Sequence, residues 1–349
     1  MSVKTTVFAL ADQPVLIALD WGTSSLRAYL LDAQGQVAVQ REAPWGILQL
    51  PAPAREGGFD QALASVAGDW LARWPQLPML AGGMVGSAQG WREAPYVPCP
   101  ADLQTLAGQL VSAQTKLGTD LHIAPGVLQP GLAGGTGRGQ MPDVMRGEEV
   151  QIVGAISGHP DWAAKSRMVL PGTHSKWATV ESGTIVRFTT SMAGELFAVL
   201  RQQSILGRLM PKDALASHPE GFARGLATGW HAGPGELITR LFSTRSLGLT
   251  GEVPPEALAD YLSGILIGSE LAAMLRNASG QEGEARSVDE HGAPLILIGS
   301  PELTARYALA LGTVGVTPAA VLDNTAPQGL WQIACAAGLI QQEGGSREP

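Results

Sequence analysis

One order of predicted elements occurs twice in this chain: strand, turn, strand, turn, strand, helix. In each copy an apolar run of strand length comes first, and short turns rich in glycine and hydroxyl residues separate the strands. The predicted strands are 15–19, 26–32 and 37–41 in the first copy and 168–171, 176–181 and 184–190 in the second, with helices over 59–74 and 194–206. A repeat at half the chain length favours duplicated α/β domains over one large sheet.

A length of 349 residues exceeds what one hydrophobic core usually holds. We therefore expect an N-terminal domain over 1–160 and a C-terminal domain over 161–349. A helix is predicted over 256–276, where Gly264 and Gly268 would let another helix approach closely. The other expected elements are a surface loop over 277–292, a strand over 295–298, a helix through 311 and a last helix over 328–341.

The charge balance limits the partners of the chain. It has 23 basic and 31 acidic residues, a net charge of −8, and its cations are scattered singly. Proteins that bind nucleic acid or anionic membranes usually have a basic excess, so we expect neither partner. An anionic ligand would instead be held by a few cations, backbone amides or a metal. Two distant cysteines, Cys99 and Cys335, are typical of a reduced, cytoplasmic protein.

Two turns combine glycine with hydroxyl residues directly after a buried strand. Glycine lets backbone amides approach phosphate oxygens, hydroxyls add donors, and a carboxylate can hold Mg²⁺ through its waters. The alternative is that both turns are ordinary hairpins. The candidate phosphate-binding residues are Gly22, Thr23, Ser24 and Ser25 in the first turn and Gly172, Thr173, His174, Ser175 and Lys176 in the second, with Asp20 as the metal-associated carboxylate.

Glycine, at 44 residues, also gathers in two further segments that carry polar side chains. In 126–147 we expect Asp143 in a loop just before a helix that begins at Glu148, where a carboxylate can accept the proton of an attacking hydroxyl. An ordinary loop aspartate or a capping aspartate is the alternative. The segment 82–96 suits a sugar-binding loop, or else a mobile surface loop. Its candidate substrate residues are Met84, Gly86, Ser87, Trp91, Arg92 and Tyr96, with Arg92 or Arg146 to pair a carboxylate.

These strings carry a resemblance to a known family. DWGTSS at 20–25, LPGTHSK at 170–176 and GSPE at 299–302 occur in the order of the phosphate and adenosine motifs of the sugar kinase, heat-shock ATPase and actin superfamily. GMVGS, PDVMRGEE, LPGTHSKW and MAGELF resemble the 2-dehydro-3-deoxygalactonokinase family from about residue 15 to 340. Ala193 departs from the family string, which is expected to have threonine there.

The resemblance implies two ribonuclease-H-like domains, an actin/hexokinase-like duplicated fold, around a central cleft. It implies a kinase that uses ATP and Mg²⁺ to phosphorylate the 6-hydroxyl of 2-dehydro-3-deoxy-D-galactonate in galactonate catabolism. Asp143 matches the catalytic position, and Glu148 is its rival. The adenosine would contact Gly299, Ser300 and Glu302. Another sugar or sugar-acid kinase, for example one for 2-keto-3-deoxygluconate, or a non-metabolic ATPase switch stays open, as does a homodimer.

Overall fold

The structure, a computed structural model, describes residues 3–8, 13–131, 141–212, 217–233, 235–276 and 293–341. It is a mixed α/β protein whose chain forms two compact units. Unit 1 comprises Met1–Lys165, Thr179–Phe188 and Asn324–Pro349, and unit 2 comprises Ser166–Ala178 and Thr189–Asp323. The strands β12 and β13 contribute residues to both units.

Unit 1 is built on a seven-stranded sheet with the order β1-β4-β3-β2-β5-β8-β7. The strands β2, β3 and β4 are antiparallel neighbours, whereas β5 and β8 continue parallel to β2. This is the ribonuclease-H-like arrangement that we expected. The seven strands are β1 (Lys4–Val7), β2 (Leu16–Trp21), β3 (Leu26–Leu31), β4 (Val37–Ala43), β5 (Met79–Gly82), β7 (Val111–Ala113) and β8 (Leu121–Ile123).

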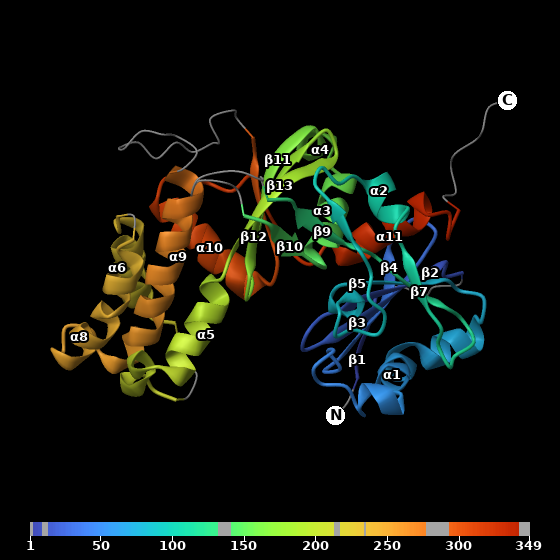
Figure 1. Cartoon of the computed structure of the whole chain (residues 1–349), viewed down its shortest axis with the longest axis horizontal. Coiled ribbons are helices and arrows are strands. Elements are labelled where there is room, and N and C mark those ends of the chain that lie inside the picture. The colour runs from blue at the N-terminus through green and yellow to red at the C-terminus, as the bar shows by residue number, and fades with distance from the viewer. Residues whose placement is uncertain are drawn as a thin grey trace. The chain divides into compact units, whose positions relative to one another are not determined.

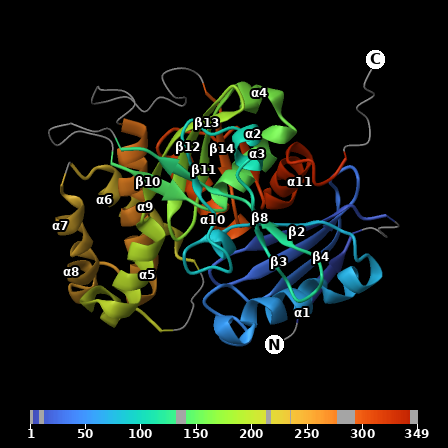
Figure 2. The same cartoon turned by 45° about the vertical axis from the view of Figure 1, so that its right-hand side comes forward.

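Alternate residues of β2 face opposite sides of this sheet, and both sides are covered. Ile17, Leu19 and Trp21 pack with helix α1 (Gly58–Arg73), which runs along one face in Figure 2. Helices α3 (Glu148–Ser157) and α11 (Ala326–Ala336) pack tightly together, with Gly154 against Thr325 and Gly329 against Val150. A central strand buried on both faces must be apolar throughout, which explains the run at 15–19.

A second, three-stranded sheet in unit 1 has the order β10-β9-β6. It joins β6 (Tyr96–Pro98), β9 (Gly126–Gln129) and β10 (Asp143–Met145), which lie far apart in the sequence. The remaining short helices of unit 1 are η1 (Ala54–Glu56), η2 (Met84–Gly86), α2 (Leu103–Ala107) and α4 (Pro160–Ala164).

The second predicted repeat forms a five-stranded sheet with the order β13-β12-β11-β14-β15. The first three strands follow one another along the chain, and β14 and β15 continue parallel to β11, as β5 and β8 do to β2. The repeat order predicted from the sequence is therefore confirmed. These strands are β11 (Lys165–Leu170), β12 (Ser175–Glu181), β13 (Thr184–Ser191), β14 (Leu295–Ile298) and β15 (Ala320–Leu322).

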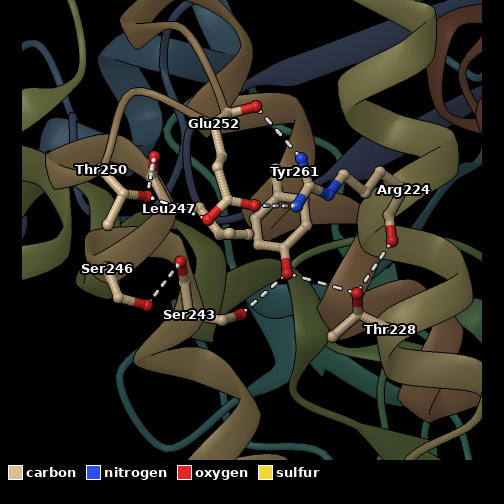
Figure 3. A network of polar contacts seen from close by, with 8 residues as sticks. All are labelled: Arg224, Thr228, Ser243, Ser246, Leu247, Thr250, Glu252 and Tyr261. Atoms are coloured by element: carbon tan, nitrogen blue, oxygen red, sulfur yellow. Dashed lines mark hydrogen bonds and ion pairs between the residues drawn. The ribbon is translucent and has the colours of Figure 1, made fainter.

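Helices make up most of unit 2, where α6 (Pro219–Trp230) and α9 (Leu258–Arg276) lie side by side in Figures 1 and 2. Figure 3 shows how Tyr261 of α9 connects both helices to α8 (Ser243–Leu249): its hydroxyl lies 3.2 Å from Thr228 Oγ1 and 2.8 Å from Ser243 Oγ. The other helices of unit 2 are α5 (Ala193–Gln203), η3 (Ile205–Leu209), α7 (Leu237–Leu241), α8 (Ser243–Leu249), η4 (Pro255–Ala257) and α10 (Pro301–Thr313).

Several predicted boundaries differ from the structure. Strand β2 runs on through Asp20 and Trp21, which we assigned to the turn, because both residues pair with β3. The last helix begins at Ala326 and ends at Ala336, earlier than predicted. The predicted loop over 277–292 lies outside the described residues. One described helix, Pro255–Leu275, is long and apolar enough to cross a membrane. Of an 18-residue stretch within this helix, 61% is buried inside the protein, as in the core helix of a soluble protein.

Candidate active site

Asp20 lies on β2 next to the first predicted phosphate turn, and 20% of its side chain is exposed. Asn324 Nδ2 donates to Asp20 Oδ2 at 3.0 Å, and Arg27 Nη1 lies 3.5 Å from the same oxygen. Burial raises the pKa of the Asp20 carboxyl, while Arg27 and Asn324 oppose that rise. Both donors thus contact the same carboxylate oxygen, Oδ2.

The turn after β2 exposes Thr23 and Ser24. Its backbone is fixed by Gly22 N–H donating to the Ser25 carbonyl at 2.9 Å. A Cβ on Gly22 would meet that carbonyl oxygen at an ordinary 3.6 Å, and the φ of Gly22 is not positive. Neither crowding within the protein nor backbone conformation therefore requires glycine here, which is consistent with a ligand that approaches the backbone closely.

Part of the segment 82–96 packs closely against unit 1. A Cβ on Gly90 would lie 2.1 Å from the Val85 carbonyl oxygen. Trp91 stacks on Phe59 with ring centroids 5.5 Å apart and meets Trp21 edge-on at 6.0 Å. Trp91 thus anchors the segment in the core of unit 1.

Arg146 joins this segment to the small sheet. Its Nη2 donates to the Ala94 carbonyl at 2.9 Å, and its guanidinium carbon lies 4.3 Å from the centre of the Tyr96 ring. A Cβ on Gly86 would lie 3.0 Å from Nη1. The structure therefore brings together three predicted substrate residues, Gly86, Tyr96 and Arg146, whereas Arg92 is exposed.

Asp143 does not lie in a loop, as we expected, but is the first residue of strand β10. It pairs with Gln129 of β9, and its Oδ1 accepts from the Val144 amide at 2.8 Å. The apolar residues after it did not show strand periodicity because the strand has three residues only. The small sheet that holds Tyr96 at one edge therefore positions Asp143 at the other.

Helix α3 begins at Glu148, as predicted, and Glu149 in its first turn has no exposed surface. Both carboxylate oxygens of Glu149 accept from the Gly147 amide at 2.8 Å. Burial raises the pKa of Glu149 to about 8, with the neighbouring Glu148 adding to the rise. Glu148 Oε2 accepts from the Arg146 amide at 3.1 Å. The burial of Glu149 was not predicted from the sequence.

In unit 2, the second predicted phosphate turn packs on the start of α5. A Cβ on Gly194 would lie 2.3 Å from the Gly172 carbonyl oxygen, and Glu195 N–H donates to Thr173 O at 2.9 Å. Thr173 and His174 are exposed, as Thr23 and Ser24 are in the first turn. His174 Nε2 forms a hydrogen bond with Glu195 Oε2. The turn therefore sits at a helix N-terminus, a favourable environment for anions.

Ser175 begins a chain of buried polar groups. Its Oγ lies 2.9 Å from Tyr307 OH, which donates to Glu270 Oε2 at 3.0 Å. The other oxygen of Glu270 accepts from Trp177 Nε1 at 2.8 Å. Ser175 has no exposed surface, and Lys176 is 4% exposed with Nζ 3.4 Å from the His174 carbonyl. These contacts fix the backbone of the turn from beneath.

A pocket of about 330 Å³ opens beside this turn within unit 2. Gly172 of the turn and Glu302 of the predicted adenosine motif both line it, although 129 residues lie between them. Phe197, Leu266 and Ile267 provide apolar walls. The volume and the mixed lining suit a small organic ligand. Ala193 also lines the pocket, so the threonine hydroxyl expected at this position is absent from its wall.

The adenosine motif follows β14. Gly299 has a φ of +153°, and its amide donates to the Leu322 carbonyl at 3.0 Å. Ser300 is exposed and precedes α10, and its carbonyl accepts from the Thr304 amide at 3.0 Å. The glycine thus lets the chain turn from β14 into α10 beside the pocket.

The described part of the chain contains no group of three or more histidine, cysteine, aspartate or glutamate side chains that could hold a metal ion. Asp20 is a single carboxylate at the end of a strand. Mg²⁺ commonly takes one or two carboxylates and fills its remaining positions with water and substrate phosphates. The Asp20 carboxylate matches this donor requirement.

Comparison with known proteins gives one consistent result. The family model described as 2-keto-3-deoxy-galactonokinase matches residues 20–333. The 2-dehydro-3-deoxygalactonokinase of Escherichia coli (strain K12) is 34% identical over 324 residues, which cover 92% of this chain and 97% of the relative. A crystal structure of a Sinorhizobium meliloti protein with the same family name has a TM-score of 0.76 and 30% identity, covering 92% of this chain and 98% of that one.

Proposed function

Because the chain belongs to the 2-keto-3-deoxy-galactonokinase family, and is therefore a kinase with an alcohol acceptor, we propose that it phosphorylates the 6-hydroxyl of 2-dehydro-3-deoxy-D-galactonate. The products would be 2-dehydro-3-deoxy-6-phosphogalactonate and ADP, within galactonate catabolism in the cytoplasm. The phosphoryl donor is ATP.

The pocket of unit 2 carries this proposal. The second phosphate turn and the adenosine motif, two separate sequence motifs, line one cavity of about 330 Å³ through Gly172 and Glu302. We assign the nucleoside to this pocket, with its phosphates directed toward the exposed residues Thr173 and His174. The N-terminus of α5 would stabilise their negative charge.

In unit 1, we assign the sugar acid to the cluster of the 82–96 segment and Arg146. Asp143 would orient the acceptor hydroxyl and accept its proton, the role that phosphoryl transfer requires of a protein base. Asp20 would hold Mg²⁺ through water, and the residues 22–25 would donate to phosphate oxygens. When bound, Mg²⁺ supplies positive charge that neutralises the phosphate oxygens.

A coupled ADP-release assay with wild-type protein and Asp143→Asn tests both the substrate and the base. We expect 2-keto-3-deoxygalactonate to stimulate ADP release above 2-keto-3-deoxygluconate and other sugar acids. Asp143→Asn should lower kcat by about 100-fold or more, because base catalysis contributes on the order of 10²–10⁴. Its KM for ATP should stay within about threefold, since Asp143 is assigned to the acceptor and not to the nucleotide.

Three results would contradict these proposals separately. Strong stimulation by another sugar acid, with none by 2-keto-3-deoxygalactonate, would overturn the substrate. Near wild-type turnover by Asp143→Asn, with an inactive Glu148→Gln, would move the base to Glu148. Slow ADP release that no sugar acid changes would indicate an ATPase switch.

A further inference from the structure

The guanidinium of Arg146 is buried without a full set of partners. The residue is 8% exposed. Nη2 donates to the Ala94 carbonyl, and the Tyr96 ring covers one face of the group. Among the residues that the structure describes, Nε and Nη1 have no hydrogen-bond partner. Buried arginine donors are rarely left in this state, because each unpaired group loses its hydration without compensation.

A second buried donor without a described partner lies in the adjoining segment. Ser87 is 8% exposed, and its Oγ has no hydrogen-bond partner in the described chain. Ser87 follows Gly86, whose missing side chain leaves room for Arg146 Nη1: a Cβ there would be 3.0 Å from that nitrogen. Arg146 and Ser87 therefore contribute unpaired donors to one small region of unit 1.

The nearest acidic residues are engaged with the backbone. Glu148 Oε2 accepts from the Arg146 amide, and both oxygens of Glu149 accept from the Gly147 amide. In the described chain, neither carboxylate accepts a hydrogen bond from Arg146 Nε or Nη1. A buried positive charge of this kind is stabilised when an anionic ligand binds to it.

We propose that Arg146, assisted by Ser87, binds the carboxylate of the sugar-acid substrate. The inference rests on the proposed function, which supplies an acceptor with one carboxylate beside its 2-oxo group. A single guanidinium matches a single carboxylate in charge, and a carboxylate can accept from several donors at once. Arg92, the rival cation, is exposed and bears its charge in water.

The test compares wild-type protein with Arg146→Gln on two acceptors: the sugar acid and its analogue in which the carboxylate is a primary alcohol. We expect Arg146→Gln to raise KM for the sugar acid by about 30-fold or more, since a hydrogen bond to a charged group is lost. KM for ATP should change by less than about threefold. Wild-type protein and Arg146→Gln should have the same KM for the alcohol analogue. Arg146→Lys, which keeps the charge, should show a smaller rise.

The matched control is Arg73→Gln, which removes an exposed arginine that also lies over an aromatic ring, 4.5 Å from the centre of Trp74. It should leave KM for the sugar acid unchanged. If Arg146→Gln raises KM for the alcohol analogue as much as it raises KM for the sugar acid, the role of Arg146 is structural. A rise in KM for ATP alone would mean that it binds phosphate, and a large effect of Arg92→Gln with none of Arg146→Gln would assign the carboxylate to Arg92.

Pyruvate separates this inference from the proposed function, because it has the same 2-oxo carboxylate end and no hydroxyl to phosphorylate. We expect wild-type protein to bind pyruvate by calorimetry or NMR titration, and Arg146→Gln to bind it at least about 10-fold more weakly. That result supports the site even if the sugar acid proves not to be the substrate. Equal pyruvate binding by the two proteins, or none by wild type, would overturn the inference.

Discussion

At the scale of single residues, Glu149 shows how burial changes what a carboxyl group does. It has no exposed surface and lies in the first turn of α3, where its oxygens accept from the Gly147 amide. Burial raises its pKa to about 8, well above the ordinary value of 4.5 for a glutamate. The folded protein therefore retains a proton on Glu149 at pH values where the unfolded chain has released it.

This difference predicts a pH dependence of stability. Below pH 4.5 the Glu149 carboxyl is protonated in both the folded and the unfolded state, and its contribution to the free energy of unfolding is fully present. Between pH 4.5 and about 8 the folded state binds more protons, so the free energy of unfolding falls as pH rises. Glu149→Gln, which cannot ionise, should lose less stability than wild type between pH 5.5 and 8.5 in urea unfolding. Exposed Glu181→Gln is the control, and equal losses in Glu149→Gln and wild type would contradict the prediction.

Sequence reasoning identified residue types at the candidate site better than their partners. Gly86, Tyr96 and Arg146 were predicted for the substrate, and the structure brings them together. Asn324 was missed because its contact with Asp20 joins residues 304 positions apart, and no local pattern encodes such a pair. Glu270 was missed for the same reason, although an acid within the apolar stretch of α9 was a usable signal.

At the scale of elements, glycines form a seam between α6 and α9. A Cβ on Gly225 or Gly229 would lie 2.0 Å from a backbone oxygen of α9, and one on Gly264 or Gly268 would lie 2.4 Å from a backbone oxygen of α6. The close approach predicted from Gly264 and Gly268 is therefore confirmed. The glycines of α6 had no assigned role in the sequence, because a seam is visible only when both helices are known.

The seam predicts the outcome of a glycine-to-alanine change. In an ordinary helix this change stabilises by about 0.5–1 kcal/mol. Gly225→Ala should instead destabilise the protein by about 1–3 kcal/mol, because the Cβ would overlap the Tyr261 carbonyl oxygen and force α6 and α9 apart. Thermal or urea unfolding measures the difference. Gly68→Ala in α1 is the matched control, since its Cβ would meet only Ala64 Cβ at 3.8 Å. A Gly225→Ala protein as stable as wild type would contradict the close contact between α6 and α9 at this residue.

Element types were predictable where the hydrophobic period was long enough to read. Helices α1 and α3 begin within one residue of their predicted starts. Strand β10 was not recognised, since its three residues are fixed by pairing with β9 and not by their own pattern. Short strands of this kind depend on tertiary contacts more than on local preference.

At the scale of the whole molecule, the two compact units do not correspond to two consecutive halves of the chain. The last helix, α11, belongs to unit 1, where Gly329 packs against Val150 of α3, although it follows the strands of unit 2 in the sequence. Thr179–Phe188 also belongs to unit 1. The half-chain repeat predicts two similar sheets but cannot show where the chain returns to an earlier unit.

Each unit holds its own candidate binding residues, which predicts two separate patterns of ligand protection. Adenosine should slow amide hydrogen exchange in the pocket elements of unit 2, namely the turn at 171–174, α5, α9 and α10. The sugar acid alone should slow exchange in 84–96 and 143–149 of unit 1. The physical reason is that a ligand stabilises most the segments that it contacts, since their opening requires its release. Ribose without a base is the control for adenosine. Protection of 84–96 by adenosine, or of the unit 2 pocket by the sugar acid alone, would reverse the assignment of the two ligands.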